Sequence, residues 1–496
     1  MTGKVFLIGA GPGDEGLITV KGQQQLQVAD VVIYDYLANP RLLKHCKKDC
    51  EKIYVGKKAG NHTLSQEEIS QLILEKAKTG KNVARLKGGD PYIFGRGGEE
   101  GEILYENGVD FEVIPGISSA IGGLAYAGIP VTFREIATSF HVITGHLSKE
   151  DKNINYKALA GLDGTLVFLM GIGNIENITQ SLMEQGKSPS TPAAIVYQAS
   201  TPKQQVVVGL LENIAKMKHT GVEKPGIIVI GEVVKKRDVL DFHSRKPLFG
   251  QKIIVTRATT QNSSLVEQIK DLGGEAIELP TIEIQILNQD ILKHQFAILS
   301  KFTHLVLTSQ NSVDIFFQTL FEAGYDARHL AQLKITAVGA VTKKALEKYF
   351  VKADFMAQTY DSKSLVTLLE QQLKPEDHVL FPRSKKANNE LIEALSQFCP
   401  VDVVTIYDTL PAPISKEQME EALKDANAVL FTSASTVECF MEPLKQMAIS
   451  VPASLKLVTI GPMTTEKLKA YGFADYIEAG SHTTAGMIET MLSKQL

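Results

Sequence analysis

The chain has 496 residues, 44% of them apolar, which is enough for about three or four domains with well-filled cores. Its net charge of -4, with basic and acidic residues interspersed throughout, argues against a dedicated nucleic-acid binder. The four cysteines are too few for a disulfide scaffold and no uncharged run reaches membrane-spanning length, so we expect a cytoplasmic protein with neither a membrane nor a nucleic-acid partner.

The first predicted strand covers residues 5–8 and runs into the glycine-rich turn GAGPGD at 9–14. The glycines follow a GxGxG pattern rather than the GxGxxG of dinucleotide-binding folds, and Pro12 removes an amide donor, so phosphate binding is disfavoured. The turn suits a nucleotide-like ligand and a simple strand-to-helix connection equally well.

Predicted strands and helices alternate through the rest of the first half. Ser65 and Glu68 form a capping box at the start of one helix, apolar residues recur on one face of it, and Gly80 ends it. Such alternation predicts βαβ units, a mostly parallel sheet and an α/β fold. A run of small residues then leads to a second set of strands. We therefore expect two lobes, about 1–116 and 117–240, with a cleft between them.

Three possible metal ligands occur together in the first lobe, namely His45, Cys46 and Cys50. The two cysteines have helical i, i+4 spacing, but no second pair completes a tetrahedral site. We interpret them as packing residues at the end of a helix and expect no metal.

Residues 85–100, RLKGGDPYIFGRGGEE, are the most informative stretch of the chain. Its glycines let the backbone approach a ligand closely. Asp90 follows the first glycine pair, where its carboxylate can accept hydrogen bonds from ribose hydroxyls or from an ammonium group. Glycine-rich turns at the carboxyl edge of a parallel sheet are where α/β proteins bind nucleotide-like ligands.

Several motifs occur in the order and at the spacing of one known family: VFLIGAGPGD, YDYL, VGKKAGNHTLSQEEI, RLKGGDPYIFGRGGEE, VIPGISSAIGGLAYAGIPVTFRE, TGH, LVFLMG and IIVIGEVV. Residues 3–240 thus resemble the S-adenosylmethionine-dependent uroporphyrinogen III C-methyltransferases. The resemblance implies a two-lobed tetrapyrrole methylase fold and a homodimer formed through this half. It also implies S-adenosyl-L-methionine as the methyl donor, with S-adenosyl-L-homocysteine as its product.

The resemblance further implies which residues contact the methyl donor: Pro12, Gly88, Gly89, Asp90, Ile93, Ser118, Ser119, Met170 and Ala199. Ser118, Ala199 and Gly226 stand where threonine, glycine and alanine are commoner in the family, and each is a small-for-small exchange. Met170 also suits a place in the core, because it ends a buried strand.

Methyl transfer to a pyrrole carbon needs the donor methyl and the carbon held in line, and then a group that takes up the released proton. By resemblance, Asp35 corresponds to a proposed proton acceptor and Lys57 to a proposed proton donor. Asp35 is also compatible with a turn cap, and Lys57 with a surface charge that pairs with a substrate carboxylate.

Residues 235–250 are charged and contain proline, which predicts a linker. An internal repeat follows it. HLVLTSQNSVDIFF (304–317) is similar to AVLFTSASTVECFM (428–441), and ITAVGAVTKKALEKYF (335–350) is similar to LVTIGPMTTEKLKAYG (457–472). Both pairs keep an offset of 122 to 124 residues, which a duplicated α/β lobe of about 120 residues explains.

Each copy places hydroxyl side chains where a buried strand meets a helix. This makes an edge that is receptive to anions, although plain helix caps would look the same. With its TRA opening and TTAGMIETM ending, the second half resembles uroporphyrinogen III synthase over residues 251–493. The resemblance implies a two-lobed α/β synthase fold with an interleaved chain: one lobe is about 251–282 plus 408–496, and the other about 284–403.

The synthase reaction closes a linear tetrapyrrole that carries many carboxylates, so binding is expected to be spread over many amides and hydroxyls. Tyr407 lies beside a predicted crossing between the lobes and is the candidate for assisting departure of the substrate hydroxyl, although a packed tyrosine is equally compatible. The candidates for substrate binding are Arg257, Thr308, Ser309, Asn311, Arg383, Ser384, Thr432, Ser433, Thr464 and Thr483.

The sequence therefore predicts a bifunctional enzyme that cyclises hydroxymethylbilane to uroporphyrinogen III and methylates this product twice to precorrin-2, for sirohaem or cobalamin. Two alternatives stay open. An NAD-dependent oxidoreductase would use GAGPGD with Asp30 or Asp35 on the ribose. Alternatively, the second half binds tetrapyrrole without catalysing a reaction.

Overall fold

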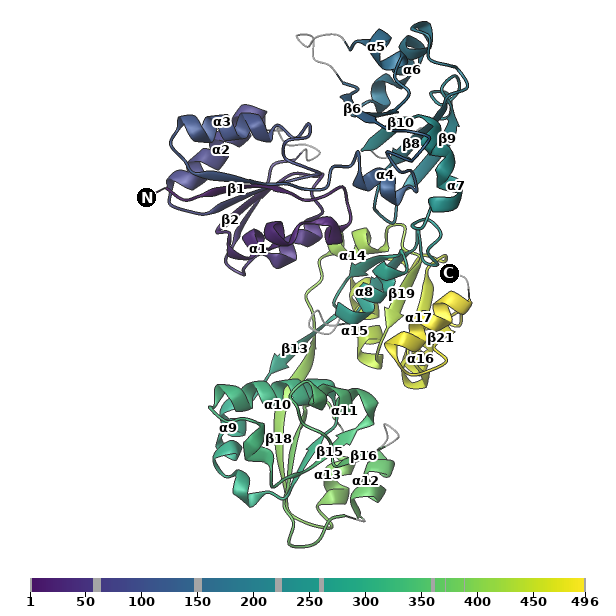
Figure 1. Cartoon of the computed structure of the whole chain (residues 1–496). Coiled ribbons are helices and arrows are strands. Elements are labelled where there is room, and N and C mark those ends of the chain that lie inside the picture. The colour runs from purple at the N-terminus through teal and green to yellow at the C-terminus, as the bar shows by residue number, and fades with distance from the viewer. Residues whose placement is uncertain are drawn as a thin grey trace. The chain divides into compact units, whose positions relative to one another are not determined.

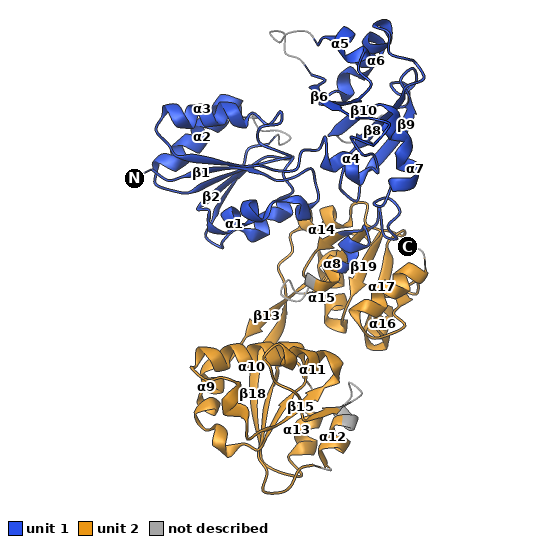
Figure 2. Cartoon of the chain, viewed as in Figure 1, with its two compact units in different colours: residues 1–251, 268–275 blue, residues 252–267, 276–496 orange. Residues whose placement is uncertain are grey.

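A computed structural model describes residues 2–56, 64–146, 154–218, 225–257, 263–357, 362–370, 372–387 and 389–494 (Figure 1). The chain forms two compact units (Figure 2). The first contains residues 1–251 and 268–275, and the second contains residues 252–267 and 276–496. Within the described ranges, no helix is both long enough and apolar enough to cross a bilayer.

The first lobe of unit 1 is a parallel sheet with strand order β3-β2-β4-β1-β5. Its strands are β1 Val5–Gly9, β2 Val31–Tyr34, β3 Glu51–Tyr54, β4 Val83–Lys87 and β5 Phe111–Ile114. Helix α1 (Val20–Val28) and the 3-10 helices η1 (Glu15–Leu17) and η2 (Pro40–His45) accompany it, together with α2 (Gln66–Lys78) and α3 (Gly97–Glu106). One face of the sheet packs against α1, and the other packs against α2 and α3 (Figure 1).

Local signals in the sequence explain where α2 begins. The Ser65 hydroxyl accepts from the Glu68 amide at 3.2 Å, and the Ser65 amide donates to the Glu68 carboxylate at 2.6 Å, so the predicted capping box is confirmed. The helical spacing expected for the two cysteines is wrong, because η2 ends at His45 and Cys46 is only its C-cap residue. Cys50 is nevertheless buried in the core between the sheet and α1, and Cys46 packs against this core.

The second lobe of unit 1 is a mixed sheet with strand order β6-β7-β10-β8-β9. Its strands are β6 Phe140–Thr144, β7 Thr165–Leu169, β8 Pro192–Tyr197, β9 Gln205–Leu210 and β10 Gly226–Ile230, and its helices are α4 Gly122–Tyr126, α5 Tyr156–Ala160, η3 Ile172–Asn174 and α6 Ile175–Glu184. Only β6 and β7 pair in parallel among these described strands. The short connection from β8 to β9 forces an antiparallel hairpin, because a parallel pair needs a long crossover.

The stretch predicted as a linker contains the 3-10 helix η4 (Glu232–Lys236) and the one-turn helix α7 (Arg237–Leu240). Beyond them, the His243 ring is buried and lies 4.9 Å from the Tyr126 ring and 5.1 Å from the Phe249 ring. Burial is the largest cause that lowers the pKa of His243. Part of the predicted linker thus packs into unit 1.

Unit 2 contains two further sheets. One has the order β12-β11-β19-β20-β21, with β11 Lys252–Val255, β12 Glu275–Glu278, β19 Ala428–Phe431, β20 Lys456–Thr459 and β21 Ile477–Glu478. The other has the order β13-β18-β17-β14-β15-β16, with β13 Ile282–Ile286, β14 His304–Leu307, β15 Lys334–Val338, β16 Phe355–Ala357, β17 Val379–Ser384 and β18 Val401–Pro411. The first of these sheets is therefore built from the two ends of the second half, and the other from its middle.

Helices cover the sheets of the second half. They are α8 Ser263–Asp271, α9 Gln289–Ala297, η6 Leu299–Lys301, α10 Gln310–Glu322, η7 Ala327–Leu330, α11 Gly339–Glu347, α12 Ser362–Glu370, α13 Glu390–Leu395, α14 Lys416–Leu423, α15 Ala434–Gln446, α16 Pro462–Ala470 and α17 Thr484–Ser493. The internal repeat is visible in α10 and α15, which each have 13 residues. Each follows a serine N-cap, Ser309 or Ser433, in a reciprocal capping pair. The α/β fold class is confirmed.

Candidate functional site

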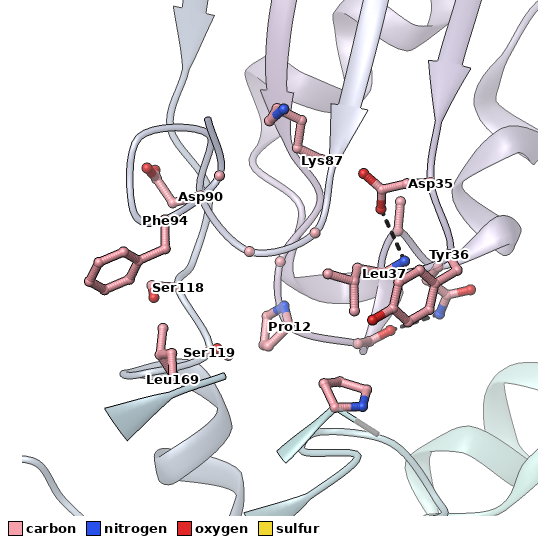
Figure 3. Close-up of a pocket in the computed structure, with 18 of the residues that line it drawn as sticks. Pro12, Asp35, Tyr36, Leu37, Lys87, Asp90, Phe94, Ser118, Ser119 and Leu169 are labelled. Carbon is pink, nitrogen blue, oxygen red and sulfur yellow. Dashed lines mark hydrogen bonds between the residues drawn. The ribbon is translucent and has the colours of Figure 1, made fainter. Parts of the chain in front are cut away.

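A cavity of about 980 Å³ lies in unit 1, where the carboxyl ends of β1, β2 and β4 face the ends of β7 and β8 (Figure 3). This volume is in the range of small-molecule and cofactor sites. Asp35 lines this cavity. So do all the residues expected to contact the methyl donor, namely Pro12, Gly88, Gly89, Asp90, Ile93, Ser118, Ser119, Met170 and Ala199. Lys57, the expected proton donor, lies outside the described residues.

Glycines at the edge of the first sheet bring three strand ends together. A Cβ atom added at Gly116 would lie 2.2 Å from the carbonyl oxygen of Gly89, and one added at Gly9 would lie 2.4 Å from the Cα of Gly116. Gly89 also has a φ of 69°, which disfavours other residues. At Gly9 and Gly116 the missing side chain therefore allows these backbone segments to contact one another.

Asp90 organises the glycine-rich loop through both carboxylate oxygens. Oδ1 accepts from the Tyr92 amide at 2.8 Å, and Oδ2 accepts from the Gly116 amide at 2.9 Å. A carboxylate has about four acceptor positions, so two remain for a ligand. Asp90 can therefore hold the loop and still accept a hydrogen bond from within the cavity.

Backbone strain is concentrated around this cavity. Phe94, Arg96, Met170 and Gln198 all line it and have positive φ angles, between 42° and 57°. Residues other than glycine rarely adopt such angles, and clusters of them occur at functional sites because the surrounding structure must maintain the strain. Met170 is about half exposed, so its predicted alternative as a core residue is wrong.

Asp35 lies directly after β2 and is held by two partners. Its Oδ2 accepts from Nη2 of Arg85 at 3.1 Å, and its Oδ1 accepts from the Leu37 amide at 3.0 Å. The Asp35 side chain is 21% exposed, whereas that of Arg85 is 3% exposed. Asp35 is thus a carboxylate at the cavity wall with a buried cation beside it, and the Leu37 contact makes it a turn cap as well.

A buried pair behind Asp35 was missed in the sequence. Nζ of Lys87 donates to Oε1 of Glu100 at 2.7 Å, and both side chains are almost fully buried. Burial and the neighbouring Arg85 lower the pKa of Lys87. The available signal was the pair of basic residues two positions apart in an otherwise apolar strand, because alternate residues share one face of a sheet.

The candidates in unit 2 lie where strands end and helices begin. Arg257, Thr308, Ser384 and Thr432 lie at or just after the carboxyl ends of β11, β14, β17 and β19. Asn311 and Thr464 lie in the first turns of α10 and α16, and Ser309, Ser433 and Thr483 are the N-cap residues of α10, α15 and α17. Within unit 2, the sheet that contains β14, β17 and β18 thus carries the candidates from 308 to 407, and the sheet that contains β11 and β19 carries the others.

Arg383 has a mainly internal role. Its guanidinium donates to Asn389 Oδ1 at 3.0 Å, to the Ser384 carbonyl at 3.1 Å and to the Ala387 carbonyl. The residue is 4% exposed, and burial lowers its pKa. These bonds hold the turn after β17. Among the described residues, no group of three His, Cys, Asp or Glu side chains could hold a metal ion.

The fold and the site together define a class: a two-part α/β protein whose first half contains a cavity suited to a nucleotide-like ligand. Residues 4–215 match the family model of Tetrapyrrole (Corrin/Porphyrin) Methylases, and residues 263–489 match that of Uroporphyrinogen-III synthase HemD. The chain is 38% identical to the "Porphyrin biosynthesis protein HemD" of Ruminiclostridium josui over 99% of this chain and 98% of that protein. The chain belongs to these two families, joined in one polypeptide, and is a bifunctional enzyme of tetrapyrrole biosynthesis.

Other relatives match the first half. The "S-adenosyl-L-methionine-dependent uroporphyrinogen III methyltransferase" of Methanosarcina barkeri is 46% identical over 48% of this chain and 94% of its own length. The crystal structure of uroporphyrin-III C-methyl transferase from Thermus thermophilus complexed with S-adenyl homocysteine is 42% identical, with a TM-score of 0.41, and covers 47% of this chain and 99% of that one. The expected methyl donor is confirmed for the family, and neither an oxidoreductase nor a second half that only binds tetrapyrrole is favoured.

Proposed function

We propose that the second half cyclises hydroxymethylbilane to uroporphyrinogen III and that the first half methylates this product twice to give precorrin-2. The support is that the two families occur in one chain and that their reactions are consecutive. The observation that carries the methyltransferase part is the meeting of all the expected donor-binding residues with Asp35 in one cavity.

S-adenosyl-L-methionine supplies the methyl group when it is bound. The cavity fits it in size, and its wall offers apolar surface from Pro12 and Ile93, backbone of the 88–90 loop, and free acceptor positions on Asp90. Ser118, which is buried, and Ser119, which is partly exposed, add to the cavity wall from the segment after β5. These residues would hold the donor at the rim of the sheet.

Asp35 is proposed as the proton acceptor. After methyl addition, the pyrrole ring must lose a proton, and an ionised carboxylate at the cavity wall can take it. Arg85 and the Leu37 amide fix the direction of the Asp35 carboxylate. Lys57 is proposed as the proton donor from its resemblance alone.

In the second half, Tyr407 is proposed to assist departure of the substrate hydroxyl. Its own hydroxyl lies 3.0 Å from Oγ of Ser309, which lies at the N-terminus of α10. That terminus attracts negative charge, so a substrate carboxylate or the leaving oxygen would be stabilised there by about 0.3 to 1 kcal/mol per contact. Binding is then shared among the hydroxyls, Arg257 and the helix amides.

The test uses the whole chain with hydroxymethylbilane, with and without S-adenosyl-L-methionine, followed by chromatography of the oxidised products. We expect uroporphyrinogen III without the donor and precorrin-2 with two equivalents of it. Formation of type I or unmethylated product in the complete mixture would overturn the proposal. The chain is further proposed to form a homodimer, and light scattering at several concentrations tests this.

A further inference from the structure

The cluster behind Asp35 is a continuous row of alternating charges. Asp35 contacts Arg85 at 3.1 Å, Arg85 Nε contacts Glu100 Oε1 at 3.3 Å, and Lys87 Nζ contacts the same oxygen at 2.7 Å. Gln66 Nε2 also donates to that oxygen, at 3.0 Å. We call Asp35, Arg85, Glu100 and Lys87 the charge network; two of its groups are anions and two are cations.

Each member comes from a place that the fold determines. Arg85 and Lys87 are alternate residues of β4 and therefore share a face of the sheet, the face that α2 and α3 cover. Glu100 comes from the first turn of α3, and Gln66 from the first turn of α2. The side chains of Arg85, Lys87 and Glu100 are 3%, 4% and 0% exposed.

The balance of charge decides how strongly Arg85 acts on Asp35. A buried charge without a partner is strongly disfavoured, so Glu100 must be neutralised inside the protein. Because Lys87 and Gln66 both donate to Glu100, Arg85 is not needed to neutralise it alone and can direct Nη2 to Asp35. Without Lys87, both carboxylates would compete for one guanidinium.

We propose that Glu100 and Lys87 are positioning residues, which act through Arg85 to set the direction and the protonation of Asp35 during methyl transfer. This inference rests on the proposed function, because it takes Asp35 as the proton acceptor. The described charged and titratable groups around Asp35 are Arg85 and Lys87 of β4, Glu100 of α3 and Tyr36 of its own loop. Burial and the Asp35 charge raise the pKa of Tyr36, so its phenol stays neutral at assay pH.

Two single variants have opposite expected effects on pH dependence. Glu100→Gln leaves an excess cation, which favours ionised Asp35, so the acidic limb of the methyl-transfer rate profile moves to lower pH. Lys87→Met leaves an excess anion, so that limb moves to higher pH. Each shift is expected to be on the order of one pH unit, given the Coulomb interaction of charges several ångströms apart.

The double variant Lys87→Met/Glu100→Gln restores the charge balance and keeps the contact between Arg85 and Asp35. Its acidic limb is expected to return toward that of the wild type, although each single variant is displaced. A purely structural role of the pair predicts additive losses without opposite shifts. Glu106→Gln, an exposed carboxylate at the end of α3, is the matched control and should leave the profile in place.

The measurement is kcat and KM for methylation of uroporphyrinogen III between pH 5 and about 9, with S-adenosyl-L-homocysteine binding by calorimetry as the test of folding. We expect kcat to change, with the KM for the methyl donor and the affinity for S-adenosyl-L-homocysteine unchanged. Coincident profiles, or shifts in one direction, overturn the inference while the proposed function stands; a wild type without methyl transfer overturns both. If Glu100→Gln fails to fold, the direction of the Lys87→Met shift and its reversal by Lys87→Arg decide the question.

Discussion

The phenol of Tyr407 and the hydroxyl of Ser309 lie 3.0 Å apart, although 98 positions separate them in the chain. Tyr407 belongs to β18, and Ser309 caps α10 after β14. β18 is also the strand that pairs antiparallel with β13, with Tyr407 opposite Ile286. The contact therefore links the β13–β18 pair, where the chain passes between the two sheets of unit 2, to the N-terminus of α10.

Tyr407→Phe should lower formation of uroporphyrinogen III and raise the share of the type I isomer, because spontaneous ring closure does not invert the last ring. We expect a loss of about tenfold rather than inactivity, since binding is spread over many groups. The ring is almost fully buried, so the variant should stay folded. Isomer analysis of the product measures the effect. An unchanged rate would show that Tyr407 only packs.

Asp90→Asn should weaken binding of S-adenosyl-L-homocysteine by roughly tenfold or more, because hydrogen bonds to a charged group contribute about 1.5 to 3 kcal/mol each. Asparagine keeps one acceptor oxygen, so it cannot accept from both the Tyr92 and the Gly116 amides. Calorimetric titration measures the affinity. Asp110→Asn, an exposed carboxylate in the same lobe, should bind as the wild type does.

Gly116→Ala should destabilise the first half and abolish donor binding. The added methyl group would lie 2.2 Å from the Gly89 carbonyl oxygen, and both partners are backbone, so neither can move cheaply. We expect a loss of about 2 kcal/mol or more in the free energy of unfolding. Urea denaturation followed by circular dichroism is the measurement. Gly98→Ala in α3 meets nothing within 4 Å and should be neutral or slightly stabilising.

Asp402 predicts a pH dependence of stability. Burial alone would raise the pKa of Asp402, but hydrogen bonds from His378 at 2.9 Å and Lys301 at 3.2 Å lower it. A carboxyl group with a lowered folded-state pKa stabilises the protein above its unfolded value near 4, and this stabilisation is lost as pH falls through the folded value.

Asp402→Asn should therefore lower the free energy of unfolding by about 1 kcal/mol at pH 7. It should make no difference at a pH where Asp402 of the wild type is protonated in both the folded and the unfolded state. The comparison requires urea midpoints of the wild type and the variant at several pH values between 7 and about 3. Asp475→Asn is the control, since that carboxylate is 91% exposed. A difference between wild type and Asp402→Asn that is independent of pH would contradict the prediction.

Much of the fold was predictable because its signals are local. The Ser65 and Glu68 capping box marks the start of α2, and the repeated serine caps of α10 and α15 reveal the duplication. The positions expected to contact the methyl donor all line one cavity. The antiparallel pairing of β7, β8, β9 and β10 in the second lobe of unit 1 was missed, because strand direction depends on connections that alternation alone does not specify.

By itself, the sequence determined the class of the two halves and the ends of the strands that carry the site, because capping, glycine turns and apolar periodicity act over a few neighbouring residues. Only the tertiary structure decided that Arg85 reaches Asp35, 50 positions away, and that Glu100 gathers Arg85 and Lys87 on one oxygen. The reason is physical: the partner of a buried charge is chosen by which strands and helices pack together, and that packing depends on contacts between residues far apart in the chain.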